Sequence, residues 1–226
     1  MTKRIEKQLN NFKYQNQPLR LTLGALVLTG LCSFLIVIAT FTQFDFNHYI
    51  LPFDFLSYLD ADFKNPAVLT HFIKHYRYIP QIPAIMFIVA LLGRRFGITS
   101  VLIYILVGLF LAPVFALGGG LTYVFQYGFG YIIAYIPAVF FAGSILRSGL
   151  TYRNIAQATL VGVLTIHIVG ILYMLFIATL QKESSSMIFG WIAAQSGAKI
   201  LYDLLFGFIA MVIAKFTKKL LWVAIG

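Results

Sequence analysis

Residues 21–43 read LTLGALVLTGLCSFLIVIATFTQ and contain no Asp, Glu, Lys or Arg. A helix needs about 20 mainly apolar residues to cross the hydrocarbon core of a bilayer, and this stretch is long enough. A secretory signal peptide would have a shorter apolar core followed by a small-residue cleavage site. We therefore expect residues 21–43 to form a transmembrane helix that stays in the protein.

The composition extends this expectation to the rest of the chain. Hydrophobic residues make up 60% of the 226 residues and charged residues 11%, against about 45–50% and about 25% in soluble domains. Five further apolar segments follow at 78–93, 97–112, 129–146, 154–178 and 188–214. A water-soluble fold could not bury this much apolar surface. The sequence predicts an all-α integral membrane protein in which residues 21–226 form one domain of six transmembrane helices.

The distribution of positive charge predicts how these helices cross the membrane. The net charge is +10, but the basic residues are scattered among short loops, which is unlike a nucleic-acid-binding surface. With the N-terminus inside, twelve of the 17 Lys and Arg lie on the inner side and five on the outer side. The positive-inside rule then predicts a multi-pass protein of the plasma (inner) membrane. Both termini are expected in the cytoplasm, with a basic tail at 1–20 and a long outer loop at 44–77.

Two outer loops have unusual sequences. In the loop 44–77, the spacing of Val68, Phe72 and Tyr76, after Asn65 and Pro66, predicts a short amphipathic helix at the membrane surface, and we interpret the loop as a lid. The loop 113–130 is rich in glycine, which allows positive φ angles and close backbone approach. Neither loop has a phosphate-binding pattern, and the chain has no HExxH or GxSxG motif. The sequence therefore indicates neither an enzyme nor a cofactor.

A pair of opposite charges in the last apolar segment is the strongest candidate site. Lys199 and Asp203 are four residues apart, which places them on one helical face. Charges inside a membrane segment are costly and are usually functional or paired. We expect them to contact a polar ligand, and Asp203 is the stronger candidate of the two. A structural ion pair, or a Lys199 side chain that extends to the membrane surface, is the alternative.

Other polar residues are weaker candidates. Gln81, between two prolines, is either a ligand-binding amide or a solvated loop residue. His167 is either a hydrogen-bonded core histidine or part of a proton relay. His71 and His75 are four residues apart without a third ligand, so we expect a solvated face and no metal. Ala25, Thr29 and Ser33 form a small-residue face that is either a partner interface, including self-association, or internal packing.

An ordered set of short motifs runs from residue 80 to residue 143. It comprises Gln81, ALLGRRFG at 90–97, SVLIY at 100–104, APVF at 112–115, the glycines 118–120 and GFGY at 128–131, and YDLL at 202–205 adds to it. This set resembles the BioY family, the substrate-binding S components of biotin transporters of the energy-coupling-factor type. The sequence departs from the family pattern at Phe206, where the family usually has Lys, and at residues 126–131.

The resemblance implies an S-component-like bundle of six helices that binds biotin near its outer face. It implies that Gln81 or Asp203 contacts the ureido group, that Tyr131 walls the ring and that Lys199 pairs with the carboxylate. The complete set of expected ligand-binding residues is Gln81, Gly119, Gly120, Gln126, Gly130, Tyr131, Lys199 and Asp203.

Membrane lipid surrounds the predicted helices. The resemblance also implies a transmembrane coupling protein and two ATPases as partners, because the chain has no Walker motif of its own. Two alternatives remain open. One is an S component for a different vitamin, and the other is an intramembrane enzyme or assembly factor that uses Lys199, Asp203 and His167.

Overall fold

The computed structural model describes residues 22–49, 73–197 and 199–225, in two compact units. One unit contains the chain up to Phe41 and from Pro80 onward, and the other is Thr42–Ile79. The predicted basic tail at 1–20, His71 and the predicted helix start at Asn65 lie outside the described residues.

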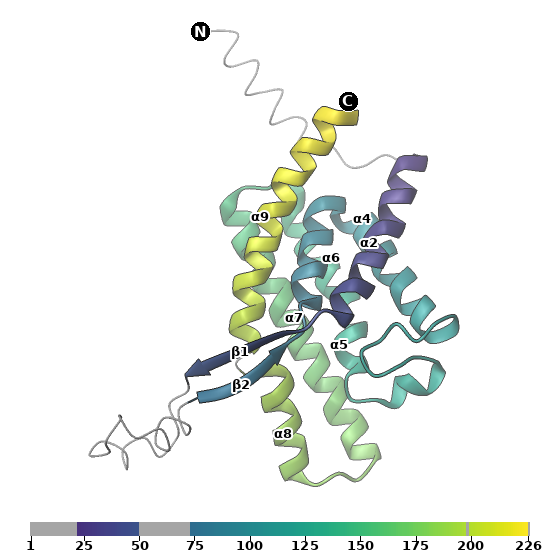
Figure 1. Cartoon of the computed structure of the whole chain (residues 1–226), viewed down its shortest axis with the longest axis vertical. Helices are drawn as coiled ribbons and strands as arrows, with labels where there is room; N and C mark the ends of the chain where they lie inside the picture. Colours follow the sequence, from purple (N-terminus) through teal and green to yellow (C-terminus); the bar gives the residue numbers. More distant parts are fainter. Residues whose placement is uncertain (1–21, 50–72, 198, 226) are drawn as a thin grey trace, which may run out of the picture. The chain divides into compact units, whose positions relative to one another are not determined.

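The larger unit is a helical bundle, as the sequence predicts (Figure 1). Within the described residues, five helical stretches are long and apolar enough to cross a membrane by length and composition. They are α2 (Leu23–Phe41), α4 (Gln81–Phe110), Phe129–Ser148, α7 (Tyr152–Leu180) and α9 (Lys199–Ile225). Phe129–Ser148 combines α5 (Phe129–Ile133), α6 (Tyr135–Ile145) and η3 (Leu146–Ser148); the shorter elements η2 (Leu121–Phe125) and α8 (Ser185–Ser196) complete the bundle. Apolar side chains cover its outside, which suits a protein surrounded by lipid.

Helix α4 is two helices joined by a reversal at Gly93. The backbone of Gly93 has φ 75° and ψ −176°, outside the helical region and in the range that favours glycine. A Cβ on Gly97 would lie 3.6 Å from the Cα of Val89, although eight residues of straight helix extend about 12 Å. The chain therefore doubles back, and the predicted segments 78–93 and 97–112 are the two arms of this hairpin.

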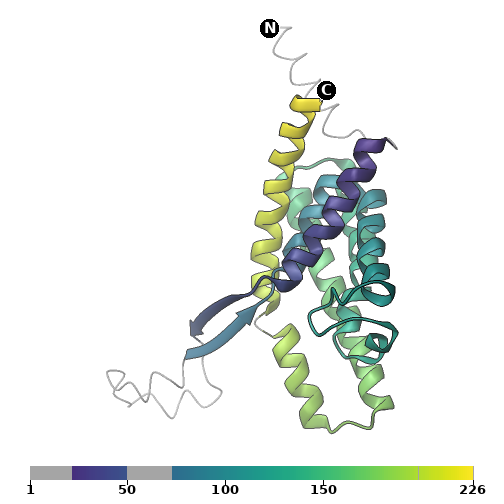
Figure 2. The same ribbon diagram turned by 45° about the vertical axis from the view of Figure 1, so that its right-hand side comes forward.

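The last predicted segment differs from expectation. The sequence predicts one helix over 188–214, whereas α8 ends at Ser196 and α9 begins at Lys199. The break is at Gly197, whose ψ of −112° leaves the helical region and where a Cβ would collide with the Ala193 carbonyl. Figure 2 shows α8 as a separate helix.

The small-residue face of α2 packs inside the chain. Ala25, Thr29 and Ser33 are all buried. The Ser100 hydroxyl of α4 donates a 2.9 Å hydrogen bond to the Thr29 carbonyl. Of the two alternatives for this face, the structure shows internal packing, in which small side chains let α2 and α4 approach closely.

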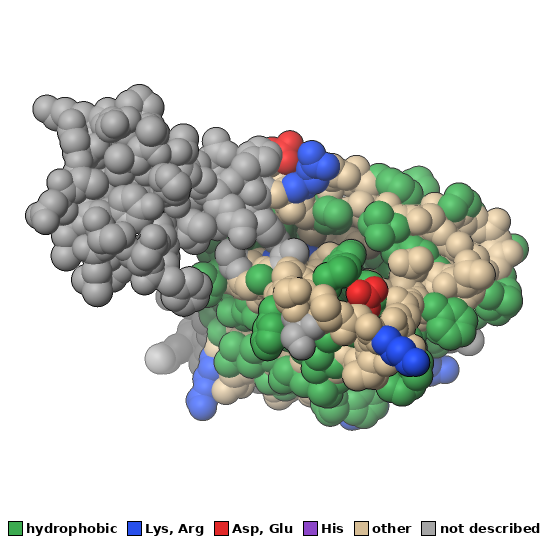
Figure 3. Space-filling view, turned by 90° about the horizontal axis from the view of Figure 1, so that it is seen from below, with side chains coloured by type: hydrophobic (Ala, Val, Ile, Leu, Met, Phe, Trp, Pro, Cys, Tyr) green, Lys and Arg blue, Asp and Glu red, His purple; other side chains and the backbone are tan. Residues whose placement is uncertain are grey.

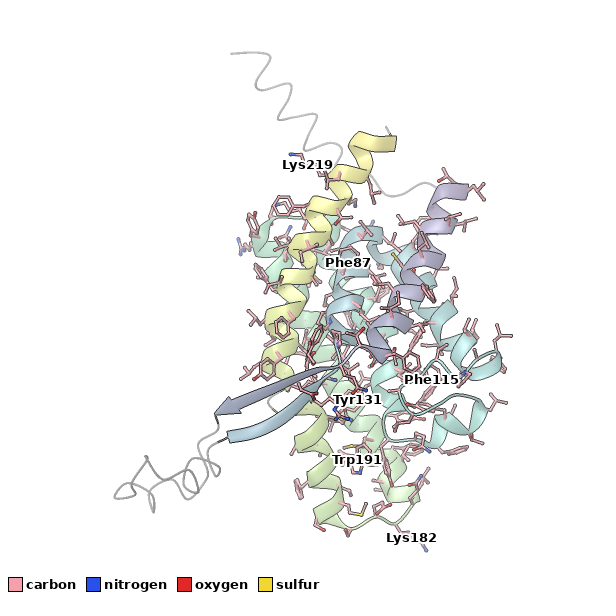
Figure 4. The ribbon with its side chains drawn as sticks, in the orientation of Figure 1. Phe87, Phe115, Tyr131, Lys182, Trp191 and Lys219 are labelled. Carbon is pink, nitrogen blue, oxygen red and sulfur yellow. The ribbon has the colours of Figure 1, made fainter. Side chains whose placement is uncertain are left out.

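Basic side chains gather at one end of the bundle. Arg94, at the turn of α4, donates a 3.3 Å hydrogen bond to Ser144, and the Lys215 ammonium lies 4.1 Å from the centre of the Tyr152 ring. Lys182 lies at the opposite end from Lys219 (Figure 4). Seen from that opposite end, the described surface is mostly hydrophobic and carries few charges (Figure 3). Among the described residues, Lys and Arg side chains that the sequence places on the inner side of the membrane thus lie at the same end of the bundle.

The smaller unit contains an antiparallel pair of strands, β1 (Phe44–Tyr49) and β2 (Ile73–Tyr78). Asp45 faces Arg77 across the pair, with 3.4 Å between the carboxylate and the guanidinium. The sequence predicts an amphipathic helix that would continue through Ile73 and Tyr76. The structure has strand β2 there, so this part of the prediction is wrong. Aromatic and β-branched residues favour strands, and here a partner strand supplies the backbone hydrogen bonds.

Candidate functional site

The centre of the candidate site is a buried pair between α7 and α9. The Nε2 atom of His167 lies 3.1 Å from the Oδ2 atom of Asp203, and the two side chains are 1% and 0% exposed. Asp203 is the carboxylate singled out in the sequence, and the structure gives it a partner on another helix. A buried carboxylate needs such a partner, because the bundle interior solvates charge poorly.

The pair extends into a chain of four polar side chains. The Nδ1 atom of His167 lies 2.9 Å from the Ser196 hydroxyl, which lies 2.7 Å from the Tyr131 hydroxyl. A neutral imidazole with its hydrogen on Nε2 lets Tyr131 donate to Ser196, Ser196 donate to His167 and His167 donate to Asp203. Every donor in the chain is then used. We call these four residues the Asp203 chain.

Two glycines shape the space around Tyr131. A Cβ on Gly170 of α7 would lie 2.5 Å from the Tyr131 ring, and a Cβ on Gly130 would lie 2.5 Å from Tyr173. Gly130 is one of the predicted ligand contacts. In the structure its lack of a side chain lets α5 and α7 approach, which positions Tyr131 beside His167, with the two ring centres 6.0 Å apart.

A second polar cluster surrounds Gln81. Its amide nitrogen donates to Thr40 at 2.6 Å and to Tyr104 at 3.2 Å, and its amide oxygen accepts a 3.1 Å hydrogen bond from Tyr135. These residues come from α2, from both arms of α4 and from α6. The Gln81 cluster is therefore a second polar site inside the bundle.

An aromatic mouth lies beyond the Asp203 chain, between α7 and α8. Its free volume is about 10 Å³, roughly the space of one water molecule, and it is lined by Tyr127, Met174, Ala178, Glu183, Met187, Ile188 and Trp191. The rings of Tyr127 and Trp191 are 5.4 Å apart, and the Tyr127 hydroxyl donates a 2.8 Å hydrogen bond to Glu183. Trp191 and Ser196 both belong to α8. The mouth offers apolar aromatic walls and few charges, but a ring compound fits between them only when the walls move apart.

The glycine-rich loop is seated on α4. The Gly120 amide donates a 2.8 Å hydrogen bond to the Gly108 carbonyl, and a Cβ on Gly119 would lie 2.7 Å from the same oxygen. These two predicted contacts therefore have a packing role here. Gln126 is exposed, and its carbonyl accepts a hydrogen bond from the Phe129 amide, at the start of α5.

Lys199 lies at the first position of α9 and is half-buried. The four-residue spacing favours it as the partner of Asp203, and the structure places the His167 Nε2 atom 3.1 Å from the Asp203 carboxylate. Sequence reasoning also missed Ser196, Thr40 and Tyr135. Their contacts join residues from 29 to 65 positions apart on different helices, and local spacing carries no signal for them.

Ser196, His167 and Asp203 have the connectivity of a hydrolase triad. A nucleophilic serine must face a substrate and a set of oxyanion donors. Ser196 is 5% exposed, and its oxygen contacts the Tyr131 hydroxyl. The arrangement therefore suits a buried recognition chain better than nucleophilic attack.

Comparison with known proteins gives a consistent result. The family model described as "BioY family" matches residues 76–222. A relative from Lysinibacillus sphaericus, "Probable biotin transporter BioY", is 38% identical over 86 residues, which is 37% of this chain and 44% of that protein. The match therefore spans less than half of that relative's length. A solved structure titled as the S-component for biotin from an ECF-type ABC transporter has a similar fold, with a TM-score of 0.61, 22% identity and coverage of 88% of this chain and 95% of that one.

Proposed function

Because the chain belongs to the BioY family, we propose that it is the substrate-binding subunit of a biotin uptake system in the plasma membrane. It captures biotin from the outer side and is a transport component, not an enzyme. Its sequence has no Walker motif, so delivery of biotin depends on an ATP-driven coupling module of a transmembrane protein and two ATPases.

The observation that carries this proposal is the Asp203 chain beside an aromatic mouth. The ureido group of biotin has two N–H donors, which match the acceptor oxygens of the Asp203 carboxylate. The thiophane ring and valeryl chain are apolar and suit the Tyr127 and Trp191 walls. Lys199, at the start of α9, supplies a cation for the biotin carboxylate.

Equilibrium binding tests the proposal directly. Purified protein in detergent is titrated with biotin by calorimetry, with thiamine and riboflavin as controls. We expect selective binding of biotin. Asp203→Asn and Lys199→Ala should weaken it, because each removes one charge from the ligand contacts. Selective binding of another vitamin by a folded sample would reject biotin as the ligand, and unchanged biotin affinity in both variants would reject the assigned contacts.

The coupling module has its own test. Cells that express the chain together with a transmembrane coupling protein and two ATPases should accumulate labelled biotin against a gradient. Cells that express the chain alone should bind biotin without accumulating it. Accumulation by the chain alone, after loss of all coupling proteins from the host, would reject the need for a partner.

A further inference from the structure

Helix α8 forms one wall of the aromatic mouth. Met187, Ile188 and Trp191 of α8 line the cavity opposite Met174 and Ala178 of α7. The opposite face of α8 carries Phe189, which is 70% exposed. With 12 residues, α8 is too short to cross a bilayer, which needs about 20. It is therefore a cover over the cavity and not a sixth long membrane span.

Both ends of α8 leave helical geometry abruptly. Before it, Lys182 has φ 56° and caps α7, where the Glu183 amide donates to the Ala178 carbonyl. After it, Gly197 has ψ −112°, in a position where a Cβ would collide with the Ala193 carbonyl. Non-helical residues therefore separate α8 from both α7 and α9.

Few contacts hold α8 in place along its length. Most of its described residues are exposed or half-buried, and Ser196, at its last position, is the buried one. The Ser196 hydroxyl contacts His167 and Tyr131, on α7 and α5. Near the middle of α8, the Trp191 ring lies against Tyr127. The C-terminal end of α8 is thus attached to the bundle through the Asp203 chain.

We propose that Ser196 is a positioning residue that latches α8 as a gate over the ligand site, through the His167 ring that Asp203 orients. The proposal rests on the function proposed above, because the gated ligand is biotin. A ligand that hydrogen-bonds to Asp203 changes the hydrogen bonds of the Asp203 chain, and these bonds also hold the Ser196 side chain in place. Occupancy of the site and closure of α8 are therefore coupled, and the latch controls how fast the ligand leaves.

A tryptophan reporter tests the gate without relying on ligand binding. The chain has two tryptophans, and Trp222→Phe leaves Trp191 alone on α8. In this background, Ser196→Ala removes the latch. Ser186→Ala is the matched control, because it removes an exposed hydroxyl of the same helix whose partner is Ser184. Acrylamide quenching measures access to Trp191, and release of labelled biotin measures the gate in the loaded protein.

We expect Ser196→Ala to raise the quenching constant of Trp191 toward that of the unfolded protein, and Ser186→Ala to leave it unchanged. Biotin should leave the Ser196→Ala protein about fivefold faster, the factor that one buried hydrogen bond contributes, with little change in its association rate. Equal quenching in the two variants, or equal release rates, would overturn the gate. If Ser196→Ala increases the quenching of Trp191 but the protein does not bind biotin, the gate is supported and the proposed function is rejected.

Discussion

The buried pair of His167 and Asp203 gives the most decisive prediction. His167→Ala leaves the Asp203 carboxylate without its imidazole donor in a fully buried position. Breaking a buried pair by removing one partner costs about 3–5 kcal/mol of unfolding free energy. Once His167 is gone, Asp203→Ala removes a carboxylate that has lost its imidazole donor, so it should cost less than it does with His167 present. A hydrogen bond to a charged group contributes about 1.5–3 kcal/mol, so we expect a coupling energy of about 2 kcal/mol.

The assay is a double-mutant cycle on reversible unfolding in mixed micelles, with helix content followed by circular dichroism. The same cycle for Lys199 and Asp203 is the matched comparison, because Lys199 is the partner suggested by the four-residue spacing. A His167–Asp203 coupling energy below about 0.5 kcal/mol, the usual limit of additivity, would refute the pairing. A larger coupling energy for the Lys199 cycle would show that Asp203 pairs along α9 and not across to α7.

Three further changes test other parts of the bundle. Gly170→Ala should push the Tyr131 ring, cost about 1–3 kcal/mol of stability and weaken biotin binding in calorimetry, whereas Gly30→Ala, which has open space, should cost little. Gly93→Ala forces a side chain into the left-handed region and should destabilise the protein by about 1–2 kcal/mol in the same unfolding assay; an unchanged midpoint would contradict the hairpin. A cysteine at position 147, in a background without the native cysteine, should react with impermeant maleimide only after cells are opened, and labelling of intact cells would reverse the predicted orientation.

Much of the bundle was predictable because membrane helices follow apolar length. The stretch 21–43 contains α2 (Leu23–Phe41), and the segment 154–178 lies within α7 (Tyr152–Leu180). The break at Gly197 was missed because apolar length alone was considered, although Gln195, Ser196 and Gly197 interrupt the apolar run and Ser-Gly is typical of a turn. The strands β1 and β2 were missed because a period of 3.6 in apolar residues was given more weight than strand propensity.

The candidate site was predictable only in part. Asp203 is visible in the sequence as a carboxylate inside an apolar segment. Its partner is not, because 36 positions separate His167 from Asp203, and packing of α7 against α9 decides which side chains meet. Spacing along one helix instead favoured Lys199. Gln81 was suggested as a ligand-binding amide or a solvated loop residue, and the structure shows its amide hydrogen-bonded to Thr40, Tyr104 and Tyr135.

The hairpin of α4 has a consequence for how the protein is made. Its first arm, residues 81–92, extends about 18 Å at the helical rise of about 1.5 Å per residue, well short of the roughly 30 Å hydrocarbon core. Most of its side chains are buried by other helices, so lipid alone would not retain it. During synthesis this arm is stably inserted only after the second arm, residues 94–110, has followed it and both arms have packed with α2, which is made earlier. Insertion of this part of the chain is thus a joint event of three helices, in which Gly93 lets the two arms fold together at the moment they enter the bilayer.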